Sequence, residues 1–174
     1  GDRRPAVEGA GMTFLGVDPG TAITGYGVIR ADGNTVFWVD SGIIRPPSGA
    51  TLAEKLEVIY DGLCERIVSH MPSCVCVEQA FYGRNARTAL VLGCARGLAL
   101  LAARKSGAVV MEFSPTEIKK TVVGNGNAAK DQVSYMVQTL LSPGEKHAQA
   151  DAYDALAAAL CAFYHYRADS VIGR

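Results

Sequence analysis

Two apolar runs of strand length each end in an acid, and this pattern constrains the fold more than any other feature of the chain. Residues 12–17 lead into Asp18, and residues 74–77 lead into Glu78. Both runs are apolar enough to be buried strands. An amphipathic helix pattern over residues 52–67 separates them. A strand, a covering helix and a second strand form a parallel crossover, so we expect both acids at the same edge of a sheet.

The remaining pattern predicts an α/β fold with a mixed five-stranded sheet flanked by helices. Three antiparallel strands are expected first, at residues 12–18, 23–30 and 35–45, and Asp32-Gly33 is a type I′ hairpin signal. Two further strands are expected to pair in parallel. They lie at residues 74–78 and 108–113, and helices are expected over 52–67, 85–105, 128–141 and 148–166, with a short helix beginning after Ser114.

The composition fits one globular domain. The chain has 174 residues, of which 49% are apolar and 20% charged, and its formal net charge is zero, which excludes a disordered protein and indicates no particular partner. We expect residues 12–174 to form a single domain, and residues 1–11 to be a disordered leader or residues added ahead of a native start at Met12. Five cysteines without metal-type spacing indicate buried thiols in a reducing compartment, and the expected location is the cytoplasm.

The expected helix over residues 85–105 has a face of small and aliphatic residues. Its members are Ala86, Leu90, Gly93, Gly97, Leu100 and Leu101. Such a face usually packs against the sheet or another helix, and a subunit interface is the alternative. The same region, between Glu78 and Glu112, contains no acid and five bases: Arg84, Arg87, Arg96, Arg104 and Lys105. These bases form either a solvated helix face or a surface for a polyanion.

Asp151 and Asp154 are a second pair of acids, three residues apart in an Ala-rich helix pattern, so both carboxylates project from nearly one face. Capping of the first helical turn would explain this pair alone. It does not explain Asp18 and Glu78, because an ionised carboxylate at the edge of a buried strand loses hydration that a cation or hydrogen-bond donors must replace. Oxygen ligands without Cys or His favour Mg²⁺ or Mn²⁺, and two such ions suit phosphodiester hydrolysis.

Several stretches carry a family resemblance, in order along the chain. They are residues 15–21 (LGVDPGT), 24–29 (TGYGVI), 77–81 (VEQAF), Asn85, 92–97 (LGCARG), 120–126 (KTVVGNG), 130–133 (KDQV) and 149–157 (QADAYDALA). As a set they resemble the RuvC family of Holliday-junction resolvases, and the resemblance runs from Met12 to about His165.

The resemblance implies a ribonuclease-H-like fold and a homodimer that makes paired, symmetric, metal-dependent nicks across a four-way DNA junction. It implies catalytic and metal-binding roles, with two ions per site, for Asp18, Glu78, Asp151 and Asp154. It implies DNA-binding roles for Phe81, Arg84, Lys119 and Lys130. Core packing of Phe81 and ordinary surface charge for the three bases are the alternatives. The RuvA and RuvB branch-migration complex is the partner that the resemblance implies besides DNA.

Two rival functions fit parts of the sequence. Residues 17–21 also look like the first phosphate loop of ATPases of the actin, hexokinase and Hsp70 type, but those proteins need two related domains and this chain is too short for a second copy. A catalytically silent DNA-binding module is the other rival. Four acids at one place argue against it, because concentrated negative charge repels phosphate.

Overall fold

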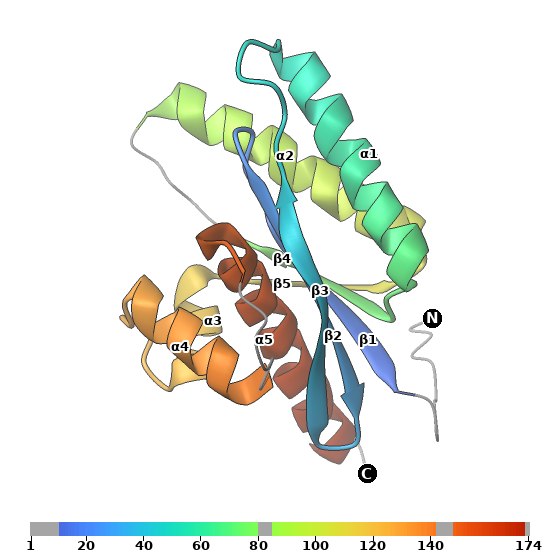
Figure 1. Ribbon diagram of the computed structural model, residues 1–174, viewed down its shortest axis with the longest axis vertical. Coiled ribbons are helices and arrows are strands. Elements are labelled where there is room, and N and C mark those ends of the chain that lie inside the picture. The colour runs from blue at the N-terminus through green and yellow to red at the C-terminus, as the bar shows by residue number, and fades with distance from the viewer. Residues whose placement is uncertain (1–10, 80–84, 142–147, 173–174) are drawn as a thin grey trace.

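A mixed five-stranded sheet forms the middle layer of the protein (Figure 1). The computed structural model describes residues 11–79, 85–141 and 148–172. The strand order is β3-β2-β1-β4-β5. The strands are β1 (Met12–Asp18), β2 (Thr24–Asp32), β3 (Thr35–Ile44), β4 (Cys74–Glu78) and β5 (Val109–Phe113). The first three pair antiparallel, whereas β4 runs parallel to both β1 and β5, which confirms the predicted sheet.

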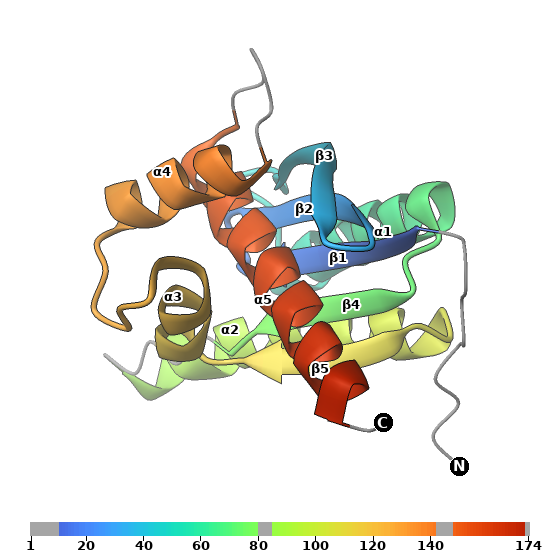
Figure 2. The same ribbon diagram turned by 90° about the horizontal axis from the view of Figure 1, so that it is seen from below.

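Helices cover both faces of this sheet. On one face lie α1 (Leu52–His70) and α2 (Ala86–Lys105), which are the crossover helices between parallel strands. On the other face α5 (Ala150–Ile172) crosses the strands, and Figure 2 shows it running over the sheet with α3 (Pro115–Val123) and α4 (Lys130–Leu141) beside it. The sheet therefore separates two hydrophobic cores, one beneath α5 and one beneath α1 and α2.

Local sequence signals account for several element boundaries. Thr51 and Glu54 form a capping box at the start of α1, and Ser114 and Glu117 form another at the start of α3. Between β2 and β3 the predicted hairpin is present, but its turn type differs from the prediction. Asp32 pairs with Thr35, so Gly33 is the first central residue of the loop, and positive φ at Gly33 alone is the pattern of a type II′ turn.

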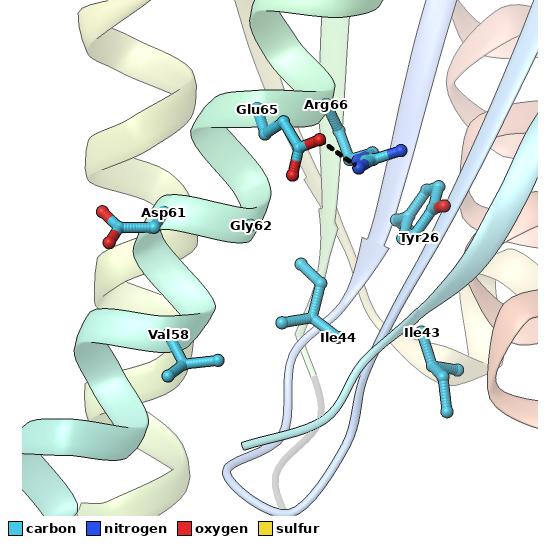
Figure 3. Close-up of a pocket in the computed structure, with 8 residues that line it drawn as sticks. All are labelled: Tyr26, Ile43, Ile44, Val58, Asp61, Gly62, Glu65 and Arg66. Carbon is cyan, nitrogen blue, oxygen red and sulfur yellow. Dashed lines mark ion pairs between the residues drawn. The ribbon is translucent and has the colours of Figure 1, made fainter. Parts of the chain in front are cut away.

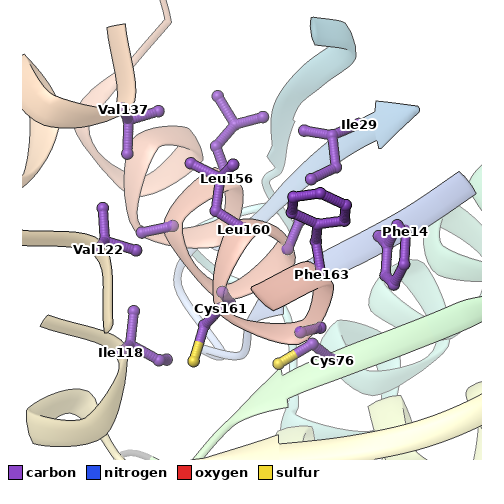
Figure 4. Close-up of a cluster of buried hydrophobic side chains, with 14 of the residues drawn as sticks. Phe14, Ile29, Cys76, Ile118, Val122, Val137, Leu156, Leu160, Cys161 and Phe163 are labelled. Atoms are coloured by element: carbon purple, nitrogen blue, oxygen red, sulfur yellow. The ribbon is translucent and has the colours of Figure 1, made fainter. Parts of the chain in front are cut away.

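The core beneath α5 is built from aromatic and aliphatic side chains of the sheet and from the small residues of the helix. Phe14 of β1 packs edge-on against Phe163 of α5, with ring centroids 5.8 Å apart. Figure 4 shows Leu156 and Leu160 of α5 between the strands and helices α3 and α4. Trp38 is buried in the same core. Because α5 has buried neighbours along most of its length, its position relative to β1 is tightly defined.

The structure differs from the sequence-based expectation on two points of burial: packing of the small-residue face of α2 inside the protein, for which a subunit interface was the stated alternative, and burial of all five cysteines. The expected packing face of α2 is turned to solvent: Leu90 is 72% exposed and Leu101 is 54% exposed, and both Gly93 and Gly97 are exposed. The helix instead buries a stripe of alanines, namely Ala95, Ala99, Ala102 and Ala103. Of the cysteines, only three are buried thiols, since Cys94 lies exposed on α2 and one other is half-buried. The pattern failed on α2 because alanine and leucine alternate around the whole helix, so hydrophobicity does not identify the buried side.

Candidate metal centre

The carboxyl ends of β1 and β4 carry the first two acids of the site. Val17 is in register with Val77, so Asp18 and Glu78 follow side by side on neighbouring parallel strands. Alternation along β4 places Cys74 and Cys76 in the core beneath α5, and Glu78 shares their face. Asp18 shares a face with Phe14 on β1 by the same alternation. Both acids therefore point to the side of the sheet that α5 covers, as the crossover predicted.

The first turns of α5 bring the other two acids to the same place. Carboxylate oxygens of Asp18, Asp151 and Asp154 all lie within 4.8 Å of one another. Glu78 lies next to them: its side chain forms a hydrogen bond with that of Asp18, and the negative charge of Asp154 raises its pKa. Four acids that are far apart in the sequence thus form one cluster between the sheet and α5, which is the convergence expected from the sequence.

Burial makes this cluster electrostatically unfavourable in the absence of a cation. Loss of hydration is the largest effect on Glu78 and, with the neighbouring charge of Asp18, raises the pKa of Glu78 to about 9. Burial also raises the pKa of Asp18 to about 6, although its hydrogen bond with Glu78 acts in the opposite direction. Glu78 is only 8% exposed and is one of two buried polar residues in the described part of the chain. Acids with raised pKa values, held together, are typical of a functional site.

The geometry suits a hard divalent cation. Mg²⁺ binds oxygen ligands at about 2.0–2.1 Å, so oxygens around one ion are separated by up to roughly 4 Å. The oxygens of Asp18, Asp151 and Asp154 meet that spacing with small side-chain movements. No Cys or His belongs to this group in the described residues, which favours hard ions over zinc or copper. Because a cation would also restore favourable electrostatics to Glu78, the residues present fit a divalent metal.

Lys130 lies directly beside the acids. It begins α4, and its Nζ donates to Oδ2 of Asp154 at 2.9 Å. Its charge also lowers the pKa values of Asp18 and Glu78, against the stronger effect of burial. The Lys130 side chain is 69% exposed, so its ammonium group lies at the boundary between the acids and solvent. It can contact an anion there without leaving the cluster.

The other predicted DNA-binding residues are less well placed by the structure. Lys119 lies half-buried on α3. Phe81 and Arg84 lie outside the described residues, in the segment that joins β4 to α2. Among the other bases, Arg96 turns inward and its guanidinium donates to the Glu112 carboxylate of β5, with Nε at 3.0 Å from Oε2. Arg96 is therefore held in an ion pair with β5, and its side chain is 24% exposed.

The close approach of α5 to the sheet was not predicted from the sequence. A Cβ atom on Gly16 of β1 would lie 1.9 Å from the carbonyl oxygen of Ala155, and one on Gly25 of β2 would lie 2.1 Å from that of Asp151. Glycines at alternate positions of β2, opposite an Ala-rich helix, were the available signal, because close contact between backbones requires small residues on both sides. These contacts bring the Asp151 turn down onto β1 and β2.

Tyr153 was also missed, although it lies between the two helical acids in the sequence. Its hydroxyl accepts hydrogen bonds from the side-chain amide of Gln138 on α4 and from the backbone N–H of Ala148, the latter at 3.3 Å. Its ring packs edge-on against Trp38, with centroids 6.0 Å apart. Tyr153 thereby fixes the start of α5 to α4 and β3.

A separate pocket lies on the opposite side of the sheet from the acids. It has a volume of about 450 Å³ and lies between α1 and the ends of β2 and β3 (Figure 3). Tyr26, Ile44 and Arg66 line it, and Arg66 is paired with Glu65 at its rim. Because Tyr26 belongs to the core beneath α1, this pocket does not communicate with the acidic cluster.

Comparison with known proteins decides the family. The family model described as crossover junction endodeoxyribonuclease RuvC matches residues 14–162. The chain belongs to the RuvC family. A curated RuvC protein from Pelotomaculum thermopropionicum is 47% identical over 155 residues, which cover 89% of this chain and 94% of that protein. Two solved structures of Thermus thermophilus RuvC are also similar. One covers 90% of this chain and 97% of its own, with a TM-score of 0.81 and 30% identity. The other, in complex with a Holliday junction substrate, has a TM-score of 0.80, 27% identity and coverage of 90% and 96%.

Membership of the RuvC family confirms the resemblance found in the sequence and the ribonuclease-H-like fold. The matched range includes all four acids and the closely packed glycines of β1 and β2. The match also argues against the two rival functions. The ATPase and the silent DNA-binding module each rested on an isolated feature, whereas the match to the RuvC family spans most of the chain.

Proposed function

We propose that this chain is a crossover junction endodeoxyribonuclease, which resolves four-way DNA junctions in recombination and repair by metal-dependent hydrolysis of phosphodiester bonds. The observation that carries this proposal is the convergence of Asp18, Asp151 and Asp154 within 4.8 Å in a chain whose family match covers residues 14–162. A relative with a similar fold is known in complex with a Holliday junction substrate.

In this proposal, Asp18, Asp151 and Asp154 hold one divalent ion and Glu78 completes the site for a second, with Mg²⁺ or Mn²⁺ as the resident metals. When bound, the ions supply Lewis-acid activation of water and stabilise the leaving oxygen. The chain itself contributes by holding the four acids in position for the ions. Asp18 and Glu78 are held by strands, and Asp151 and Asp154 by a packed helix, so the ligands need little rearrangement before reaction.

Lys130 contacts the scissile phosphate or one beside it in this proposal, because its exposed ammonium group already borders the acids. Lys119 on α3 is likewise proposed to contact the DNA backbone near the scissile phosphate. Phe81 and Arg84, which lie outside the described residues, are proposed to contact opened bases and the neighbouring backbone. Base stacking on an aromatic side chain contributes about 1 to 3 kcal/mol per base, which suits a substrate with an opened branch point.

The exposed face of α2 supports the proposed homodimer. It consists of Leu90, Gly93, Cys94, Gly97 and Leu101. By length and composition α2 could also cross a membrane, yet it packs on the sheet through buried alanines, and Arg96 in its middle bonds to Glu112. Burial of the apolar face in a two-fold interface accounts for its composition and for the exposed glycines, which allow two helices to approach closely. Two equal active sites would then meet two equivalent strands of a junction, as paired nicking requires.

The cell location and the protein partner follow from the same function. We infer a cytoplasmic enzyme that works with the RuvA and RuvB branch-migration complex, because resolution of a junction follows its migration along DNA. The family match supports this inference. Co-purification of this chain with the two proteins on junction DNA would test it.

The experiment that tests the proposed function is cleavage of a synthetic four-way junction with Mg²⁺ or Mn²⁺. We expect Asp18→Asn, Glu78→Gln and Asp151→Asn to abolish cleavage while junction binding is largely kept. Asp131→Asn is the matched control, because Asp131 is an exposed acid on α4 next to Lys130 and does not belong to the cluster. Full cleavage by the three site variants would overturn the assignment of the acids.

A further inference from the structure

Gly25 lies where the two halves of the acidic cluster meet. In the antiparallel pairing of β1 with β2, Gly25 is the direct partner of Asp18. On the α5 side, an ideal Cβ atom at Gly25 would lie 2.1 Å from the carbonyl oxygen of Asp151 and 2.7 Å from its carbonyl carbon. One glycine therefore touches the backbone of both a strand acid and a helix acid.

Space, and not backbone conformation, requires glycine at this position. Gly25 is not among the residues with positive φ, so its backbone would accept an alanine. The atoms that a Cβ would meet belong to the Asp151 backbone in the first turn of α5, and no side-chain rotation can move them away. An added methyl group must therefore push the Asp151 turn away from the β1–β2 pair.

Gly16 and Gly27 make similar contacts farther along α5. A Cβ on Gly27 would lie 2.7 Å from the backbone nitrogen of Leu156, and the contacts of Gly16 are with Ala155 and Ala159. These two glycines hold the first half of α5 on the sheet. Gly16 acts next to Asp154 through Ala155, whereas of the three only Gly25 contacts Asp151 itself, so it controls the separation between Asp151 and Asp18.

We propose that Gly25 is a positioning residue that sets the spacing of Asp18 and Asp151 and thereby makes the site selective for Mg²⁺ or Mn²⁺ over Ca²⁺. This proposal rests on the metal site of the proposed function. Lengthening the 2.1 Å approach to an ordinary contact of 3.4 Å would move the Asp151 turn outward by about 1.3 Å. Mg²⁺ requires near-octahedral ligands at about 2.0–2.1 Å, whereas Ca²⁺ accepts six to eight oxygens at about 2.3–2.6 Å in flexible geometry. Widening the cluster therefore costs more Mg²⁺ affinity than Ca²⁺ affinity.

The test compares Gly25→Ala with Gly27→Ala, whose added Cβ would meet Leu156 at 2.7 Å and not the backbone of Asp151. Calorimetric titration of the DNA-free protein with Mg²⁺ and with Ca²⁺ gives the two dissociation constants, and thermal unfolding in EDTA gives the stability of each variant. We expect Gly25→Ala to weaken Mg²⁺ binding at least tenfold and Ca²⁺ binding less than threefold. Gly27→Ala should lower the unfolding temperature without changing the ratio of the two constants.

Met71→Gly provides a more stable background in case Gly25→Ala alone does not fold. Met71 ends α1 in the left-handed conformation, with φ of 43°, and is 81% exposed and remote from the acids, so glycine there relieves strain without touching the site. If Gly25→Ala weakened the binding of Mg²⁺ and of Ca²⁺ by the same factor, the proposal would be overturned. Failure to fold in both backgrounds while Gly27→Ala folds would also overturn it, because the contact would then support the fold and not tune the site. If the unaltered protein binds neither ion, the metal site itself is refuted.

Discussion

Replacing Glu78 by glutamine should stabilise the metal-free protein while abolishing its activity. Burial raises the pKa of Glu78 from 4.5 to about 9, so near neutral pH the folded protein keeps this carboxyl protonated while the unfolded chain ionises it. The stabilising effect of protonation is thus fully present below pH 4.5 and is lost as the pH rises through about 9. Asp18, whose pKa is also raised, acts in the same direction.

The size of this effect on stability follows from how far the working pH lies above the pKa of Glu78 in the unfolded chain. Each pH unit above the unfolded pKa costs about 1.4 kcal/mol. At about pH 7.5, three units above the unfolded value, the cost reaches about 4 kcal/mol at most, and the coupling of Glu78 to Asp18 reduces the share that glutamine can recover. We expect a gain of about 2 to 4 kcal/mol for Glu78→Gln, which for a chain of this size corresponds to a rise in melting temperature of roughly 5 to 15 °C.

Thermal unfolding in EDTA at two pH values is the assay. The variant should melt well above the unaltered protein near pH 7.5, and the difference should almost vanish near pH 4, where Glu78 is neutral in both states. Saturating Mg²⁺ should narrow the difference near pH 7.5, because the ion stabilises the folded protein that has all four acids more strongly. Equal melting temperatures near pH 7.5, or a difference that persists near pH 4, would refute the argument that burial of Glu78 destabilises the metal-free site.

Three further predictions concern the basic residue, the subunit interface and the helix anchor. Lys130→Ala should slow junction cleavage and reduce the salt dependence of binding by about one unit of slope, with Lys55→Ala on the far face of the sheet as control; an unchanged slope would remove Lys130 from the DNA surface. Leu101→Asp should convert the proposed dimer to a monomer in sedimentation experiments, whereas Val68→Asp, at a still more exposed apolar position on α1, should leave the oligomeric state unchanged. If both variants remain dimeric, α2 is not the interface. Tyr153→Phe should lower the free energy of unfolding by about 1 to 2 kcal/mol in urea, because Gln138 and Ala148 then lose their acceptor; unchanged stability would show that this hydroxyl does not anchor α5.

The acids could be predicted from the sequence because each follows from a rule of local structure. Once the crossover is recognised, strand alternation fixes the face of the sheet on which an acid at a strand end lies, and the parallel pairing fixes the edge. The sequence therefore placed Asp18 and Glu78 side by side, as the pairing of β1 with β4 shows. A spacing of three residues on a helix places Asp151 and Asp154 on one face. Their convergence on the strand acids needed only α5 to lie across the carboxyl ends of β1 and β4.

The parts that sequence reasoning missed depend on tertiary contact. For the small-residue face of α2 the sequence left open internal packing or a subunit interface, and the stripe that is buried in the protein consists instead of alanines. Helix hydrophobicity cannot separate an inward face from a subunit face, since both are apolar. The contact of Gly25 with Asp151 was likewise hidden, because it is made between backbone atoms that are distant in sequence.

In the proposed function, the acidic cluster cuts phosphodiester bonds at a four-way junction. The decisive experiment measures, with Mg²⁺ and at equal concentrations, the cleavage rate of a four-way junction and of linear duplexes with the same arm sequences. We predict rapid, paired nicks in strands of the junction, little cleavage of the duplexes, and none of either substrate in EDTA or with Asp18→Asn. Equal rates on junction and duplex would contradict junction resolution, and cleavage that survives both EDTA and Asp18→Asn would contradict the metal centre itself.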